Sequence, residues 1–241
     1  MEPKKISFFL PNLFTALNMA CGFVAILLAF EGKYYRACIF IGIGSIFDLF
    51  DGRVARWTGT QSSFGEQFDS LSDLISFGMA PAIIFYMKFL SGYERLGIVL
   101  AYLYLLCGAL RLARFNVNIK EVSSDYFQGL PIPGGALALI SYILISLHFP
   151  FFNDRYLSAI YIFIYSLFLI STIPFFSFKK SEFIQKNKKK IFLLIILAIA
   201  LILTNEQVAL FTFLNLYALI SLVLFIKNRK NVVNELLDID E

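Results

Sequence analysis

The sequence has 241 residues, of which 59% are hydrophobic and only 16% are charged. Soluble domains average roughly 45–50% apolar and about 25% charged residues, so this composition excludes an ordinary soluble domain and indicates an integral membrane protein. The net charge of +4 reflects an excess of basic residues on one side of the membrane rather than binding to nucleic acid.

Several stretches are apolar enough to be predicted as membrane-spanning helices, since a span needs about 20 mostly apolar residues. They are residues 12–30, 36–50, 71–90, 96–113, 132–150, 156–177, 191–204 and 207–226. The stretch 191–204 is short and can alternatively be one leg of a helical hairpin with the last span. The predicted fold class is therefore all-α, a polytopic membrane helical bundle of about eight transmembrane helices.

The chain is predicted to form a single domain. Residues 1–11 are predicted as a short interfacial segment, because Lys4 and Lys5 stand beside apolar residues. Pro11 is predicted to begin the first span, where its missing N–H does no harm. Residues 178–241 are predicted to contribute two C-terminal spans and a polar tail.

Basic residues predict the orientation, because cytoplasmic loops carry an excess of Lys and Arg. With both ends in the cytoplasm, most of the 21 Lys and Arg residues fall on the inner side. The outer side then holds only Lys33, Arg36, Lys88, Arg95 and Arg155. This orientation places the segment FDLFDGRVAR, residues 47–56, at the cytoplasmic face.

The cysteines and the single histidine do not suggest a catalytic site. Cys21, Cys38 and Cys107 lie in apolar runs without paired spacing and are interpreted as packing residues. His148 lies at a predicted outer helix end. Catalysis by a histidine or a Cys–His pair is therefore not expected.

Four aspartates stand at helical spacing near the second and third predicted spans. Asp48 and Asp51 are three residues apart, and Asp69 and Asp73 are four apart, so each pair shares one helix face. Two antiparallel helices joined by a short cytoplasmic loop would bring all four carboxylates into one cleft. Ionisable residues embedded in such apolar sequence indicate function.

Carboxylates at such close range repel one another, and a divalent cation would relieve the repulsion. Ligands without His or Cys favour Mg²⁺, Mn²⁺ or Ca²⁺ over zinc, and the oxygens could hold two ions per site. Magnesium usually completes its shell with waters and substrate phosphates. The cluster therefore predicts a phosphate-bearing substrate at the inner membrane surface.

Small and basic residues flank these aspartates. Gly52, Ala55 and Gly65 would let a backbone or a ligand approach closely. Arg56 follows Gly52 by about one helical turn and could donate two hydrogen bonds to a phosphate. Arg53 is instead predicted to be an anchor at the inner membrane face.

The spacing resembles the signature of the CDP-alcohol phosphatidyltransferase family. The matching positions are Asp48, Asp51, Gly52, Ala55, Arg56, Gly65, Asp69 and Asp73. The resemblance implies a membrane bundle with a six-helix catalytic core, here residues 12–177, usually assembled as a homodimer. It also implies transfer of a phosphatidyl group from CDP-diacylglycerol to an alcohol, with release of CMP.

The resemblance further implies individual roles. The four aspartates would hold two divalent ions, and Asp73 would also act as general base. The residues implied to bind CDP-diacylglycerol are Pro11, Asn12, Gly52, Ala55, Arg56, Ser62 and Gly65.

Three further stretches bear on the acceptor alcohol. Residues 11–23 (PNLFTALNMACGF), 108–117 (GALRLARFNV) and 127–136 (FQGLPIPGGA) resemble the phosphatidylserine synthases of bacteria and archaea, whose acceptor is L-serine. A serine carboxylate would pair well with an arginine. We expect Arg114 and Asn116 near the acceptor, with Arg111 as a further candidate, although both arginines could instead be anchors at the inner face.

Two alternatives remain. Another acceptor, such as glycerol 3-phosphate or an inositol compound, would keep the family and change the substrate. A cation transporter could use the aspartates as its ion path, but their position near one face and the absence of an internal repeat oppose it. The expected location is the inner membrane of a bacterium, with the active site facing the cytoplasm.

Overall fold

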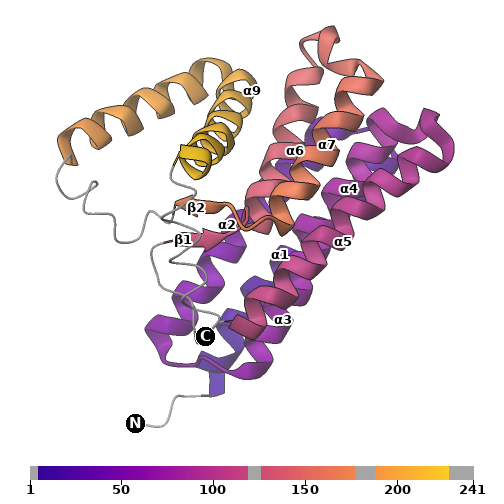
Figure 1. The fold of residues 1–241 in the computed structure, drawn as a ribbon. Helices are drawn as coiled ribbons and strands as arrows, with labels where there is room; N and C mark the ends of the chain where they lie inside the picture. The colour runs from indigo at the N-terminus through magenta and orange to yellow at the C-terminus, as the bar shows by residue number, and fades with distance from the viewer. Residues whose placement is uncertain (1–4, 119–125, 177–187, 228–241) are drawn as a thin grey trace.

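The computed structural model describes residues 5–118, 126–176 and 188–227, and these are almost entirely helical (Figure 1). The predicted all-α fold class is confirmed. Two short strands are an addition that the sequence did not suggest.

The first two helices form a hairpin. Helix α1 (Lys5–Phe30) and helix α2 (Tyr34–Thr58) are joined by a tight turn in which Gly32 has a φ of 73°. The expectation that Pro11 begins the first span is wrong, because α1 begins at Lys5 and contains Pro11. Proline removes only one backbone donor, and the apolar residues around it continue the helix.

The next helix is continuous but changes its winding. Helix α3 (Ser63–Asp73) leads into the π-helical segment η1 (Leu74–Met79), helix α4 (Ala80–Phe85) and a second π-helical segment, η2 (Tyr86–Leu90). Short π-helical segments inside helices often accompany functional sites. Here η1 begins directly after Asp73.

Five further elements complete the core of the bundle. The single-turn helix η3 (Ser91–Tyr93) is followed by helix α5 (Glu94–Asn118). After a loop come helix α6 (Ile132–Ser146), the short helix η4 (Pro150–Asn153) and helix α7 (Arg155–Ile170). Helices α6 and α7 therefore end earlier than the predicted spans 132–150 and 156–177.

Helix α6 is the central element, and most of its residues are buried. The ring of Tyr142 packs among those of Phe85, Phe89, Tyr161 and Phe211, at centroid distances from 4.4 to 6.2 Å. Many phenylalanine side chains thus pack between helices, whereas others lie on the outer faces, where lipid is the natural neighbour.

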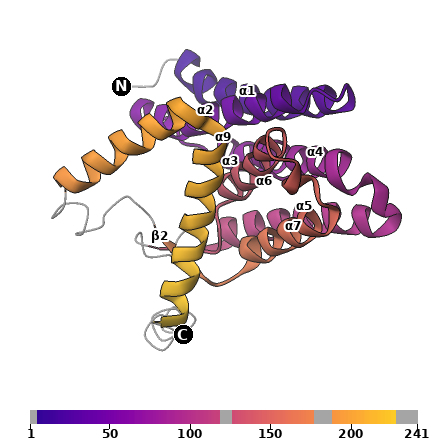
Figure 2. The ribbon, with the colours of Figure 1, turned by 90° about the horizontal axis from the view of Figure 1, so that it is seen from above.

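Strands β1 (Tyr126–Gln128) and β2 (Pro174–Phe176) pair in antiparallel register, with Tyr126 opposite Phe176. Helix α9 (Lys188–Lys227) has a non-helical residue at Asn205, and its two legs meet there at an angle (Figure 2). The predicted stretches 191–204 and 207–226 correspond to these legs.

By length and composition, three helical stretches in the described part of the chain could cross a membrane: Phe9–Phe30, Ser63–Val117 and Asn205–Val223. Ile132–Ser146 and Arg155–Ile170 are shorter apolar helices. The N-terminal end of α1, the C-terminal end of α2 and the whole of α3 lie together at one end of the bundle (Figure 1). The candidate site is at this end.

Candidate functional site

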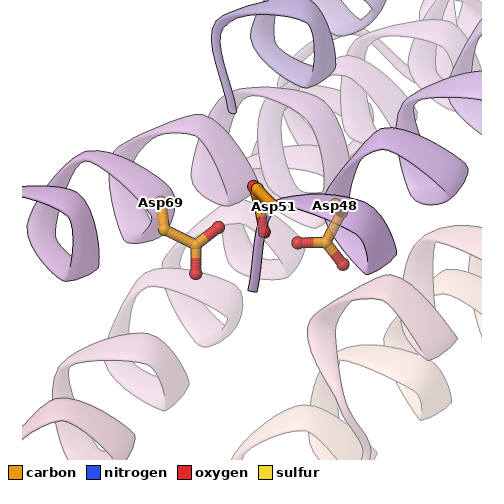
Figure 3. Close-up of side chains that lie close together, drawn as sticks. All are labelled: Asp48, Asp51 and Asp69. Atoms are coloured by element: carbon orange, nitrogen blue, oxygen red, sulfur yellow. The ribbon is translucent and has the colours of Figure 1, made fainter. Parts of the chain in front are cut away.

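Three aspartates from two helices face a common space (Figure 3). Asp48 and Asp51 come from α2 and Asp69 from α3, and one carboxylate oxygen of each lies within 4.8 Å of the others. The prediction that these residues meet in one cluster is confirmed. At this spacing all three could hold one cation.

A short turn brings the two acidic helices together. Gly59 ends α2 with a φ of 65°, and its N–H donates to the carbonyl of Ala55. Ser62 caps the start of α3, where its Oγ accepts from the N–H of Gly65 at 3.1 Å. The left-handed conformation at residue 59 suits glycine, and serine is among the preferred N-cap residues.

The fourth aspartate adjoins the other three. Asp73 is buried, and its carboxyl interacts directly with that of Asp48. Its Oδ1 accepts a hydrogen bond of 3.2 Å from the amide of Asn18 on α1. The structure therefore places Asp73 at the deeper side of the cluster, beside α1.

The donor set fits a divalent cation. The Oδ1 atom of Asp69 is buried and has no hydrogen-bond partner among the described residues. Buried polar atoms are normally paired, and several carboxylates so close together repel one another. Oxygen ligands alone favour Mg²⁺, Mn²⁺ or Ca²⁺, as the sequence predicted.

Four residues predicted to contact the nucleotide lie where α1 approaches the start of α3. A Cβ atom added to Gly65 would lie 3.3 Å from Ser62 Oγ and 3.5 Å from Asn12 Oδ1. Pro11, which precedes Asn12 on α1, is buried. Glycine at position 65 therefore leaves room beside Ser62 Oγ and Asn12 Oδ1.

Gly52 and Arg56 lie one turn apart near the C-terminal end of α2. A Cβ atom added to Gly52 would lie 3.5 Å from Arg56 Nη1, so the guanidinium folds back over the glycine. Arg56 is exposed. An anionic ligand next to the aspartates could reach this guanidinium without obstruction from a side chain at position 52.

The three residues predicted to bind the acceptor have different surroundings. Arg114 donates from Nη1 to the carbonyl of Ile170 and from Nη2 to that of Ser171, both at 3.1 Å, and so closes the end of α7. Asn116 donates to the hydroxyl of Ser70, at 3.0 Å. Asn116 therefore contacts the helix that carries Asp69 and Asp73.

Arg111 is the buried arginine of these three residues. It is only 7% exposed, and its Nε has no hydrogen-bond partner within the described segments. Its charge interacts with that of Asp73. A buried, incompletely paired guanidinium beside the site suits an anionic ligand.

Two contributors were missed at the level of sequence. Thr15 and Asn18 of α1 are buried and bond to Asp51 and Asp73 respectively. The available signal was two polar residues three positions apart in a mostly apolar helix, a spacing that places both on one face.

The fold and the site define a helical membrane protein with an acidic site suited to a divalent cation and a phosphate-bearing substrate. A sequence profile of the CDP-alcohol phosphatidyltransferase family matches residues 8–170. The chain belongs to this family, as the spacing of its aspartates predicted. The family is membrane-bound and depends on divalent cations.

Relatives are similar over most of their length. A CDP-diacylglycerol–serine O-phosphatidyltransferase of Helicobacter pylori is 34% identical over 215 residues, which cover 88% of this chain and 89% of the relative. An archaetidylserine synthase of Methanothermobacter thermautotrophicus is 41% identical over 180 residues, 73% of each chain. A CDP-diacylglycerol–serine O-phosphatidyltransferase of Methanocaldococcus jannaschii is 40% identical over 171 residues, covering 70% of this chain and 75% of the relative.

Proposed function

We propose that the chain transfers the phosphatidyl group of CDP-diacylglycerol to L-serine, producing phosphatidylserine and CMP in phospholipid biosynthesis. The observation that carries this proposal is the meeting of the α2 and α3 carboxylates in one cluster, with the buried Arg111 near enough to Asp73 for their charges to interact. This arrangement offers sites for a diphosphate and for an acceptor carboxylate side by side. The similarity to relatives named for the same acceptor supports it.

The acidic residues Asp48, Asp51, Asp69 and Asp73 would hold two divalent cations, Mg²⁺ or Mn²⁺ in preference to Ca²⁺. When bound there, the cations supply neutralisation of the charge on the diphosphate and on the leaving phosphate. Arg56 donates to a phosphate oxygen, and Gly52 leaves room for it. The nucleotide lies toward Pro11, Asn12, Ala55, Ser62 and Gly65, and the acyl chains lie between helices.

The acceptor occupies the side of Asp73. The serine hydroxyl oxygen attacks the β-phosphorus of CDP-diacylglycerol, and Asp73 takes the hydroxyl proton. The bond between that phosphorus and the bridging oxygen breaks, and the oxygen leaves as part of CMP. Arg111 pairs with the serine carboxylate, and Asn116 lies at the edge of the acceptor site.

The basic residues support a cytoplasmic site. Arg53, Arg56, Arg111 and Arg114 belong to the set that the sequence places on the inner side. We therefore place the active site at the cytoplasmic face of a bacterial inner membrane. The homodimer implied by the family resemblance is checked by light scattering of the purified protein in detergent.

CMP release by the purified protein tests the proposal. With CDP-diacylglycerol and Mn²⁺ or Mg²⁺, release should require L-serine and should be lost in Asp73→Asn. Asp154→Asn is the matched control, because Asp154 caps α7 by accepting from Leu157 N–H at 2.8 Å and asparagine caps equally well. CMP release that does not depend on serine but requires glycerol 3-phosphate or inositol would show that the acceptor is that alcohol and not serine. Cation flux into proteoliposomes without CMP release would support a transporter instead.

A further inference from the structure

We propose that Thr15 and Asn18 of α1 are positioning residues that orient the carboxylates of Asp51 and Asp73. The inference rests on the proposed function, because it assigns those carboxylates to cation binding and proton transfer. Neither α1 residue is a member of the aspartate signature. Both contribute through hydrogen bonds that cross between helices, from α1 to Asp51 of α2 and from α1 to Asp73 of α3.

Thr15 fixes Asp51. Its Oγ1 lies 2.9 Å from Asp51 Oδ2 and 3.2 Å from the carbonyl oxygen of Pro11. A hydroxyl has one hydrogen to donate, and an ionised carboxylate is the stronger acceptor. The other oxygen of Asp51 accepts from the N–H of Gly52. Each carboxylate oxygen therefore has one fixed donor, which sets the plane of the group.

Asn18 fixes Asp73 in the same way. Its Nδ2 donates to Asp73 Oδ1 at 3.2 Å, and its side chain is fully buried, with 0% exposure. Its own Oδ1 has no partner among the described residues and lies 3.0 Å from where a Cβ on Gly44 would be. An unpartnered buried amide oxygen is destabilising. The orientation is explained by Asp73, since the opposite orientation of the amide would turn its oxygen toward the carboxylate.

The backbone of the same two residues holds the helix that carries Asp69 and Asp73. Ser72 Oγ donates to the carbonyl of Thr15 at 2.9 Å, and Ser76 Oγ donates to the carbonyl of Asn18 at 2.8 Å. A Cβ on Gly22 would lie only 2.7 Å from Ser76 Cα, so α1 approaches this helix closely. One face of α1 thus bonds to Asp51 of α2 and to the continuous helix formed by α3 and η1.

Hydrogen bonds to metal-binding carboxylates typically change metal affinity or activity by about 10–100-fold when they are removed. The test therefore compares Thr15→Val, which keeps the shape and removes the donor, with Thr15→Ser, which keeps the donor. Asn18→Leu removes the amide. Ser166→Ala is the matched control, because Ser166 is a buried hydroxyl that bonds within α7, to Ile162 O at 2.8 Å.

The first measurement is Mn²⁺ binding in the absence of lipid substrate. The signal of free Mn²⁺ in electron paramagnetic resonance reports how much of the ion is bound. We expect Thr15→Val to weaken binding by about 10–100-fold, Thr15→Ser to restore most of it, and Ser166→Ala to match the unsubstituted chain. The second measurement is CMP release at saturating Mn²⁺. We expect Asn18→Leu to lower kcat by a similar factor while the KM for serine changes little.

Unchanged Mn²⁺ binding in Thr15→Val would overturn the proposal for Thr15, and so would equal losses in Thr15→Val and Thr15→Ser. An unchanged kcat in Asn18→Leu would overturn it for Asn18. Asp51→Asn separates this failure from failure of the proposed function. If Asp51→Asn binds Mn²⁺ as the unsubstituted chain does, the cation site itself is wrong, and the positioning role falls with it.

Discussion

Arg111 and Arg114 are three residues apart on α5, yet their side chains have different neighbours. The guanidinium of Arg114 donates to the carbonyl of Ile170, the last residue of α7, and to that of Ser171, which follows it. Arg111 is buried beside Asp73 with an unpaired Nε within the described residues. Burying a charge without full pairing is unfavourable. A bound carboxylate would supply the missing partner at Arg111, whereas Arg114 already contributes to the fold.

We therefore predict that Arg111→Gln raises the KM for L-serine by about tenfold to a hundredfold, since hydrogen bonds to charged groups contribute roughly 1.5–3 kcal/mol. The KM for CDP-diacylglycerol should change little. Initial rates of CMP release at varied serine and varied lipid measure both constants.

Arg114→Gln is the matched control for this prediction. It should lower the unfolding temperature in detergent, because two carbonyls at the end of α7 lose their donors, while the KM for serine stays nearly unchanged. The reverse pattern, in which Arg114→Gln raises the KM for serine at an unchanged unfolding temperature, would assign the acceptor to Arg114.

Helices α2 and α3 present their carboxylates to each other because the turn between them is tight. Gly59 makes this turn in a left-handed conformation, and Ser62 starts the next helix three residues later. Residues other than glycine disfavour a positive φ, because their Cβ atom clashes with the backbone. The acidic cluster therefore depends on the backbone conformation of Gly59, which adds no side chain to it.

We predict that Gly59→Ala lowers the free energy of unfolding by about 1–2 kcal/mol. It should also reduce the rate of CMP release by more than the loss of folded protein accounts for. The rate should fall because a changed turn shifts the carboxylates of Asp51 and Asp69 relative to each other. Thermal unfolding and CMP release of the same preparation check this.

Gly42→Ala is the matched comparison, because Gly42 lies inside α2 and a Cβ there would have no atom within 4 Å. It should be stabilising by about 0.5–1 kcal/mol and should leave the rate unchanged. If the two alanine variants behaved alike, the turn would not be what positions the carboxylates.

Across the described residues, many exposed apolar side chains accompany a partly buried acidic cluster at one end of the bundle. Apolar side chains that face lipid favour insertion into the membrane, whereas neighbouring carboxylates repel each other and oppose folding. Functional sites commonly retain such unfavourable groups. The stability of this chain should therefore depend on whether a divalent cation is bound.

We predict that Asp69→Asn makes the chain more stable than the unsubstituted one in a chelator, by on the order of 1 kcal/mol, while abolishing CMP release. Added Mn²⁺ should raise the unfolding temperature of the unsubstituted chain and should have little effect on Asp69→Asn. Calorimetry with EDTA and with Mn²⁺ measures both effects. A destabilised Asp69→Asn in EDTA would show that repulsion in this cluster is small.

Much of the site could be predicted from local spacing. Asp48 and Asp51 share a helix face, as do Asp69 and Asp73, because the helical repeat alone decides which residues point the same way. Composition alone indicated apolar helices and the membrane. These features depend only on residues within a few positions of one another.

Contacts between distant segments could not be predicted in this way. Thr15 bonds to Asp51, Arg114 to the end of α7, and β1 to β2 across many residues of intervening chain. Local periodicity carries no distance between helices, so the sequence could not assign Arg114 to α7 and Arg111 to the vicinity of Asp73. The sequence by itself determined which residues lie on the same helix face. Only the packing of α1, α2 and α3 decided which of those faces meet and which donor each carboxylate receives.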